Sequence, residues 1–202
     1  LMVLHQNRAD RGRYNYLPEE KLPGFIDLVV WGHEHDCRIE PEFNTRTTTW
    51  ITQPGSSVAT SLSEGESIEK KVGILEVCGK EFKLIPVKLK TVRPFIFNSI
   101  NIEDYSDELR LDDRDAKKRI HTFYCNLVDE MIEKSKERLN GHSKQPKLPL
   151  IRLRVIYIND QHIINTARFG QIYEKKVANS DSLLVFKKQV KRVKNAAYNP
   201  DE

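Results

Sequence analysis

The chain has 202 residues, of which 39% are hydrophobic and 8% aromatic, so it can form a substantial hydrophobic core and is not expected to be disordered throughout. Its apolar runs are far shorter than the ~18 residues that a membrane span needs, and we therefore expect no membrane association. The three cysteines are an odd and widely spaced set, which argues against a disulfide framework and for a reducing compartment.

Charge is distributed unevenly along the chain, whose formal net charge is +4. Residues 1–92 carry 12 basic and 13 acidic side chains, a net charge of −1. Residues 93–202 carry 21 basic and 16 acidic side chains, a net charge of +5. The basic second part is compatible with a polyanionic partner.

Residues 1–92 are dominated by strand patterns. Apolar, alternating or β-branched segments predict strands at 1–4, 25–31, 44–52, 72–77 and 81–89. The last two are expected to form a hairpin with Gly79 at its turn, and a compact turn is expected at 53–57. A short helix is expected around 18–22, where Pro18 suits a first helical turn.

The pattern changes near Val92. Apolar residues three or four apart predict a long amphipathic helix within 112–139, and a polar linker follows it. Residues 150–158 predict a strand in which Ile151, Leu153, Val155 and Tyr157 face one side and the arginines face the other. Residues 160–195 mix helical and strand signals. We therefore predict a β-rich unit at 1–92 and, on a tether, a smaller α+β unit at 93–202.

Three of the six histidines lie at the ends of predicted strands, at positions 5, 33 and 35. Residues two apart in an extended backbone point to the same face, so His33 and His35 can reach one site while Glu34 points away. Imidazole binds manganese, iron and zinc, and a pair at this spacing can serve two ions ~3.5–4 Å apart in a two-metal hydrolase. His5 ends an apolar strand and is followed by polar residues suited to contact phosphate or to orient ligands.

Other interpretations of these histidines stay open. The His-x-His pair can simply be exposed or stabilise a turn, and Cys37 could add a third ligand for a structural zinc ion, although no partner Cys-x-x-Cys or His-x-x-x-His is present. The remaining histidines fit structural positions and are assigned no role. Trp31 and Trp50 are expected to pack in the core beneath the site, and Ser56 and Ser57 to shape a turn.

Basic residues form two further candidate surfaces. Near His5, the candidates for a clamp on a phosphate backbone are Asn7, Arg8, Arg11 and Arg13. In the second unit, the candidates for nucleic-acid contact are Arg152, Arg154, Arg168 and the run Lys187–Lys194. Both groups could equally be ordinary solvated surface.

Several motifs together resemble the nuclease subunit of the MRN/MRX double-strand-break repair complex, the meiotic-recombination-eleven family in its eukaryotic form. They lie at 5–8, 31–36 and 53–62, and the similarity continues at 91–95, 149–157 and 168–170. The Gly-x-His motif alone would indicate only a calcineurin-like metallophosphoesterase. The Gln-Pro-Gly-Ser-Ser sequence at 53–57 and the Arg-Leu-Arg-Val strand are more specific.

This resemblance implies an α/β fold. Residues 1–92 would be the C-terminal part of a four-layer α/β/β/α metallophosphoesterase sandwich, and residues 93–202 a small α+β capping domain that orients DNA and ends in a basic tail. It implies that His5 and His33 bind one Mn²⁺ and His35 the other.

The resemblance also implies a function and partners. The family hydrolyses phosphodiester bonds as a 3'-5' exonuclease and single-strand endonuclease in homologous recombination and meiosis. The implied partners are DNA ends, single-stranded DNA, an SMC-like ABC ATPase, a nibrin-type regulatory subunit and a second copy in a homodimer, all in the nucleus.

Some motifs of the family pattern are not present in this sequence. The family's metal site also uses an Asp-x-His, a bridging Asp and an Asn-His pair from an N-terminal region, and the family carries C-terminal ATPase-binding helices. We therefore expect this chain alone to bind manganese poorly and to be inactive as a nuclease. The alternatives are a metallophosphoesterase that acts on other phosphoesters and a DNA-binding scaffold module without catalysis.

Overall fold

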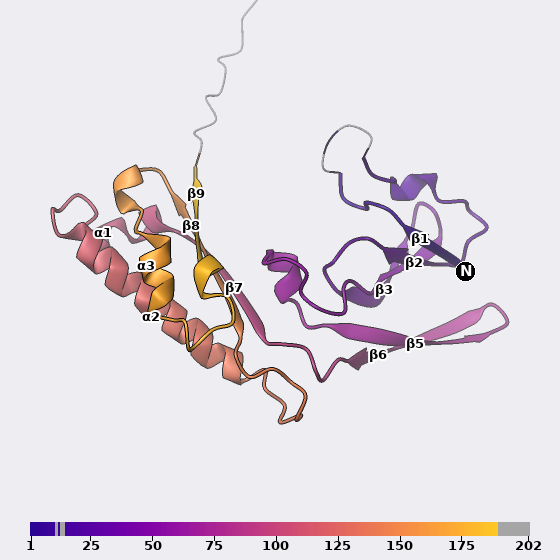
Figure 1. The fold of residues 1–202 in the computed structure, drawn as a ribbon. Helices are drawn as coiled ribbons and strands as arrows, with labels where there is room; N and C mark the ends of the chain where they lie inside the picture. Colours follow the sequence, from indigo (N-terminus) through magenta and orange to yellow (C-terminus); the bar gives the residue numbers. More distant parts are fainter. Residues whose placement is uncertain (11, 13–14, 190–202) are drawn as a thin grey trace, which may run out of the picture.

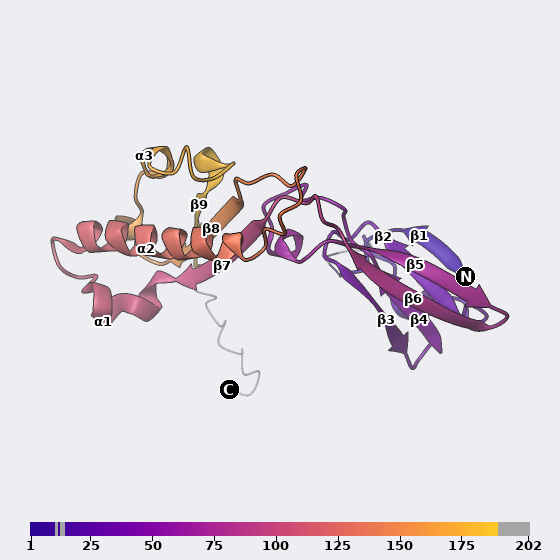
Figure 2. The same cartoon turned by 90° about the horizontal axis from the view of Figure 1, so that it is seen from below.

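The computed structural model describes residues 1–10, 12 and 15–189 and has two lobes that lie end to end (Figures 1 and 2). The first lobe contains a four-stranded sheet in the order β1-β2-β4-β3 and a separate hairpin, β5-β6. Its strands are β1 Met2–His5, β2 Leu28–Gly32, β3 Arg38–Asn44, β4 Thr49–Gln53, β5 Lys71–Cys78 and β6 Glu81–Lys88. Its 3-10 helices are η1 Glu19–Lys21, shorter than the expected helix, and η2 Glu64–Ser67.

The second lobe is a three-stranded parallel sheet, in the order β7-β8-β9, with helices packed on one face. Its strands are β7 Phe95–Asn101, β8 Leu150–Tyr157 and β9 Leu184–Lys188. Its helices are η3 Ile102–Tyr105, α1 Ser106–Leu109, α2 Ala116–Lys136, η4 Asp160–His162, α3 Thr166–Gln171 and η5 Ser180–Ser182. The long amphipathic helix and the strand at 150–158 are thus confirmed, whereas β7 was not predicted.

The core of the first lobe lies beneath the parallel strands. Val29 and Trp31 of β2 are fully buried and pack with Ile51 and Leu22. Trp31 also donates from Nε1 to the carbonyl of Gln6 at 2.7 Å, which satisfies its polar group. The placement of Trp31 in the core is confirmed.

The expectation that Trp50 lies in the same core is wrong. Trp50 is 39% exposed and stacks at the surface between Phe43 and Phe82, with ring centroids 4.9 Å and 6.1 Å away. Successive side chains of a strand alternate between the two faces of the sheet, so Trp50 lies on the face opposite to that of Ile51. Trp50 therefore joins the sheet to the hairpin.

The strand predicted at 44–52 is confirmed only for 49–52, which belong to β4, because the chain turns at 45–48. The side-chain oxygen of Asn44 accepts hydrogen bonds from the backbone N–H groups of Arg46 and Thr47, at 3.0 Å and 3.3 Å. Such an Asx turn replaces the strand pairing, and Thr48 takes a positive φ of 54°. The segment therefore separates β3 from β4, which pair antiparallel. The predicted hairpin is confirmed, with Gly79 at its turn at φ +62°.

Strand β8 divides the second lobe into a covered and an open face. Ile151, Leu153 and Val155 are fully buried in the same core as α2. Arg152 and Arg154 alternate with them on the other face of the sheet. Figure 1 shows that the helices lie on the side of this sheet away from the first lobe, so the open face is turned toward the first lobe.

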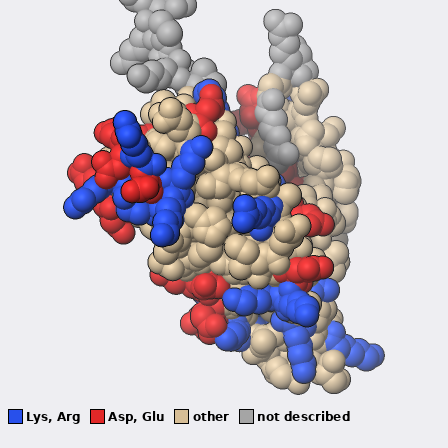
Figure 3. Space-filling view, turned by 60° about the vertical axis from the view of Figure 1, so that its left-hand side comes forward, with Lys and Arg blue, Asp and Glu red and all other residues tan. Residues whose placement is uncertain are grey.

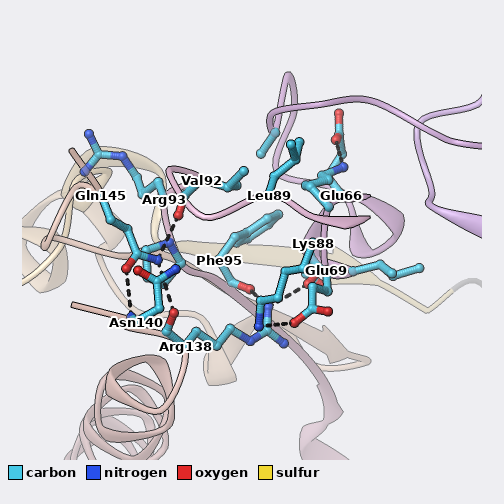
Figure 4. Close-up of a pocket in the computed structure, with 15 residues that line it drawn as sticks. Glu66, Glu69, Lys88, Leu89, Val92, Arg93, Phe95, Arg138, Asn140 and Gln145 are labelled. Atoms are coloured by element: carbon cyan, nitrogen blue, oxygen red, sulfur yellow. Dashed lines mark hydrogen bonds and ion pairs between the residues drawn. The ribbon is translucent and has the colours of Figure 1, made fainter. Parts of the chain in front are cut away.

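The connection between the lobes is a clamped segment and not the expected tether (Figure 4). Arg138, just beyond α2, donates from Nη1 to the carbonyls of Ser67 at 2.7 Å and Phe95 at 2.6 Å. Gln145 donates from Nε2 to the carbonyls of Val92 and Arg138, each at 3.1 Å. These hydrogen bonds tie the second lobe both to η2 and to the connecting backbone. The residues involved also line a small cavity of about 50 Å³.

The mixed α/β class is confirmed. The four-layer sandwich, the capping domain and the domain boundary at 92/93 stay predictions. No helix in the described part of the chain is long and apolar enough to cross a membrane.

The two faces of β8 predict a contrast between neighbouring substitutions. Leu153→Ala should lower the free energy of unfolding by about 2–5 kcal/mol, because it leaves a cavity under α2. Ile156→Ala, on the open face, should cost less than about 1 kcal/mol. Urea unfolding followed by circular dichroism measures both. Equal losses would mean that helices do not cover one face only.

Candidate metal centre

Two histidines meet where parallel strands end. β1 pairs with β2 in parallel, with His5 opposite Gly32, so His5 and the residue after Gly32 emerge at the same sheet edge. The rings of His5 and His33 are perpendicular, with centroids 5.1 Å apart. A Cβ atom on Gly32 would lie 2.9 Å from Nδ1 of His5, so glycine is needed for this close approach.

His33 and His35 do share one recess, but not for the reason expected. The backbone is not extended there, because His33 has a positive φ of 86°. The chain bends instead, and both imidazoles line a recess of about 590 Å³. Asp36 and Glu64 also line it, as does Arg154 from the open face of the second lobe. The recess therefore lies between the lobes.

A buried carboxylate fixes the ring of His35. Glu66, whose side chain is fully buried, places Oε1 at 2.8 Å from Nδ1 of His35. An ionised carboxylate can only accept hydrogen bonds, so Nδ1 is the donor in this contact, and in the neutral ring the lone pair is then on Nε2. Histidines that bind metals are commonly oriented in this way.

Glu66 is held in its charged form by its neighbours. Burial by itself raises the pKa of Glu66, but hydrogen bonds from Lys70, Thr60, Ser56 and His35 outweigh burial and hold the pKa far below its ordinary value of 4.5. Lys70 Nζ lies 2.7 Å from Oε2 and also donates to Ser56 Oγ, at 2.8 Å. Ser56, which was expected to shape the turn, also contacts this carboxylate. Its Oγ donates a hydrogen bond to Glu66 at 2.7 Å.

Sequence reasoning missed both Glu66 and Lys70. The only available signal was a glutamate and a lysine four residues apart beside a glycine, which usually indicates an exposed pair. Gly55, which precedes Ser56, has a φ of +74°. A Cβ atom there would lie 2.7 Å from the carbonyl oxygen of His35. The turn therefore packs directly against the backbone that carries the histidine.

Arg8 is occupied by the fold, which argues against the expected phosphate contact. Its side chain is only 9% exposed, and Nε donates to Glu19 at 2.8 Å while Nη2 and Nη1 donate to Glu42 and Gln53, each at 3.1 Å. The backbone N–H of Arg8 donates to Glu34, which is itself buried. Phosphate binding would require breaking these ion pairs in a partly buried site.

The other candidates near His5 are less informative. Asn7 donates from Nδ2 to the carbonyl of Asn15 at 2.6 Å and so closes the loop. Arg11 and Arg13 lie outside the described residues.

The basic candidates of the second lobe separate onto two faces. Arg154 lines the histidine recess, with its guanidinium 4.7 Å from the ring centre of Phe97. Arg152 is on the same open face, but Nη1 donates to the carbonyl of Ser182. Arg168 lies on α3, on the helix-covered side. Of the run Lys187–Lys194, Lys187 and Lys188 belong to β9, and 190–194 lie outside the described residues.

The donor set suits a transition metal but is incomplete within this part of the chain. Imidazoles, one of them fixed by a carboxylate, are suitable ligands for manganese or zinc. Among residues 1–10, 12 and 15–189, no group of three or more His, Cys, Asp or Glu side chains is arranged to hold an ion. A structural zinc site at His33, His35 and Cys37 therefore has no support in the described structure.

Comparison with known proteins identifies the family. A model described as "Mre11 DNA-binding presumed domain" matches residues 82–202. The chain is 43% identical over 211 residues to Double-strand break repair protein MRE11 of Coprinopsis cinerea, a match that covers 100% of this chain and 29% of that protein. The chain belongs to the MRE11 family.

Other MRE11 proteins have similar sequence identity to this chain. Identity is 40% over 186 residues with the Homo sapiens protein, which covers 92% of this chain, and 40% over 197 residues with the Arabidopsis thaliana protein, which covers 98%. Each match covers 26% of the relative's own length. The chain thus spans roughly a quarter to three tenths of the MRE11 proteins that it matches.

The buried carboxylate predicts a pH-dependent effect of Glu66→Gln. At neutral pH the variant should lose about 3–5 kcal/mol of stability, because it leaves Lys70 buried without its counter-charge. Because folding lowers the pKa of Glu66, its ionised form stabilises the fold at pH values above the ordinary pKa of 4.5. This stabilisation declines as the pH falls below 4.5 toward the folded-state pKa. The difference between parent and variant should therefore shrink in acid.

Denaturant unfolding between pH 3 and pH 7 measures this difference. Glu69→Gln is the matched control, because Glu69 forms an exposed pair with Lys88 and should cost less than about 1 kcal/mol. A stability difference for Glu66→Gln that stays constant over this range would contradict a carboxylate stabilised in its charged form.

Proposed function

We propose that this chain is part of a manganese-dependent DNA nuclease subunit that processes double-strand breaks. One observation carries the proposal. The carboxylate-oriented His35 and the neighbouring His33 share a recess with Arg154, a cation from the other lobe. Metal ligands facing a phosphate-binding cation are the arrangement that phosphodiester hydrolysis requires. The names of the relatives refer to double-strand break repair and support the same conclusion.

Within this site, His5 and His33 would hold one manganese ion and His35 the other. When bound, the two ions would supply Lewis-acid chemistry for phosphodiester hydrolysis. The chain's own contribution is geometric. Glu66 accepts a hydrogen bond from Nδ1 of His35, which leaves Nε2 as the nitrogen that would bind metal. Further ligands, including a bridging carboxylate, would come from outside the residues described.

DNA would lie along the open face of the second lobe. Arg152, Arg154 and Lys187 occupy this face, as the alternation of β8 and the pairing of Ile156 with Lys187 show. A run of cations beside the recess suits a polynucleotide backbone better than a small phosphoester. This argues against the alternative of a metallophosphoesterase with other substrates.

The wider organisation follows from the family. Residues 1–92 would form the C-terminal part of the four-layer metallophosphoesterase sandwich and residues 93–202 the capping domain. The full protein would act in the nucleus, in homologous recombination and meiosis, as a homodimer with an SMC-like ABC ATPase and a nibrin-type subunit. Its activities would be 3'-5' exonuclease and single-strand endonuclease.

A second candidate is a DNA-binding scaffold module without catalysis. It is favoured by the lack of a complete metal-binding group among the described residues and by the matching family model, which is described as DNA-binding. The two candidates differ in whether the protein's function requires bound metal and His35.

We predict that the 202-residue chain by itself binds Mn²⁺ weakly and cleaves no DNA. The full-length polypeptide that contains these residues should cleave single-stranded DNA with Mn²⁺, and His35→Ala should lower its metal affinity by at least 10–100-fold. Electron paramagnetic resonance titration measures bound Mn²⁺ independently of cleavage. His142→Ala is the control, since His142 is exposed in a loop. Two tight sites in the isolated chain, or full cleavage by His35→Ala, would overturn the assignment.

Arg154 should contribute to DNA binding without metal. Arg154→Ala should weaken binding of a single-stranded oligonucleotide by about 1 kcal/mol and lower the slope of log affinity against log salt by about one. Fluorescence anisotropy at several salt concentrations measures both quantities. Arg46→Ala is the control, because Arg46 pairs with Glu20 on the exposed β3–β4 turn. Equal effects of the two variants would exclude a specific role of the open face.

A further inference from the structure

A second recess lies on the helix-covered side of the second lobe. It has a volume of about 800 Å³ and is formed between α2, α3 and the segment before α3. Its apolar surface comes from Ile163, Ile164, Phe169 and Ile172. Ile172 is 50% exposed, although a side chain of this kind is usually more stable when covered. The recess is therefore an apolar surface without a cover in the described structure.

Cationic and imidazole groups border this apolar surface. Lys117 and His121 reach it from α2, and Arg168 from α3. The ring of His121 lies edge-on to Phe169, with centroids 5.5 Å apart, and so forms part of the wall. No ion pair involves Lys117 or Arg168 within the described residues. In Figure 3, a broad area of this side of the molecule has few charged groups, and Lys and Arg side chains, interspersed with Asp and Glu, stand at its edge.

The first turn of α2 is rich in cations, although the residue that caps it is the acidic Asp115. The first turn of this 21-residue helix contains no acidic residue and carries Lys117, Lys118 and Arg119. Cations near the positive end of a helix dipole are unfavourable. Arg119 is compensated by Asp113 and by the carbonyls of Leu109 and Arg110. Lys117 forms no ion pair within the described residues and lines the recess, so it is available to an anionic partner there.

This recess is separate from the histidine site. Arg154 and the histidines are on the open side of the β7-β8-β9 sheet, whereas α2 and α3 cover the opposite side. A DNA strand in the histidine recess would thus have the sheet between it and Lys117. A phosphate backbone also has no groups that would favour the apolar surface, whereas a peptide with both apolar and acidic side chains matches both features.

We propose that the recess between α2 and α3 binds a short acidic peptide segment of a partner protein. An apolar side chain of the peptide covers Ile164 and Ile172, and its carboxylates pair with Lys117 and Arg168. The proposal does not depend on the nuclease function, because it uses no residue of the metal centre.

The test is selection of a random twelve-residue peptide library, displayed on phage, against the 202-residue chain. Enriched peptides should combine apolar residues with Asp or Glu. Lys117→Glu with Arg168→Glu should lower their affinity by about tenfold or more. Ile172→Asp should lower it as well, because it removes apolar contact and repels the carboxylates. Fluorescence anisotropy of the synthetic peptides gives the affinities.

The matched control is Lys118→Glu with Lys175→Glu. These lysines are also exposed on α2 and just after α3, but they do not line the recess, so the same change in net charge should leave peptide affinity within about twofold. Circular dichroism and thermal unfolding establish that all variants are folded.

Three outcomes would overturn the proposal. The first is that no peptide is enriched, or that the enriched peptides bind both double variants equally. The second is that a DNA duplex competes with the peptides and loses affinity in the recess variant alone, which would make the recess a nucleic-acid site. The third is self-association of the chain that only the recess variant abolishes, which would identify a second copy as the occupant.

Discussion

The buried carboxylate of Glu66 is the interaction on which the first lobe's candidate site depends. A charge removed from water is costly unless hydrogen bonds and a counter-charge replace its hydration. Here those groups come from separate segments of the chain: His35 after β2, Ser56 in the turn after β4, and Thr60 and Ser61 in the following loop. Lys70 adds the counter-charge. Loops without regular secondary structure thereby acquire a fixed shape, and the ring of His35 acquires a fixed orientation.

The same short helix η2 also connects the two lobes. Glu66 holds the histidine, and the carbonyl of the next residue, Ser67, accepts a hydrogen bond from Arg138. Arg138 in turn binds the carbonyl of Phe95 at the start of β7, in the sheet that carries Arg154. A continuous set of contacts thus relates the position of the basic sheet face to the position of the histidines. The order of these contacts explains how a cation from one lobe comes to line a recess built by the other.

Periodic features of the fold could be predicted from the sequence, and single tertiary contacts could not. The alternation of apolar residues around Leu153 predicts which face of β8 is buried, and their spacing predicts which side of α2 is buried. The Asx turn at Asn44 and the positive φ of His33 leave no periodic trace, so β3 and the bend between the histidines were missed. The histidines were found because their residue type is itself informative. Glu66 and Arg8 were not recognised as buried, because a charged residue in a polar loop reads as exposed until its partners are known.

The clamped connection has a consequence for how this segment can be divided. The backbone at Lys90 and Val92 accepts hydrogen bonds from Asn140 and Gln145, far along the chain, so the apparent border belongs to both lobes. A chimera joined at this border would separate donors from their acceptors unless it also transferred η2 and the residues around Arg138. A segment that keeps these hydrogen bonds intact is therefore larger than either lobe. The connecting segment and the residues that hydrogen-bond to it, Arg138, Asn140 and Gln145, therefore act as one structural unit.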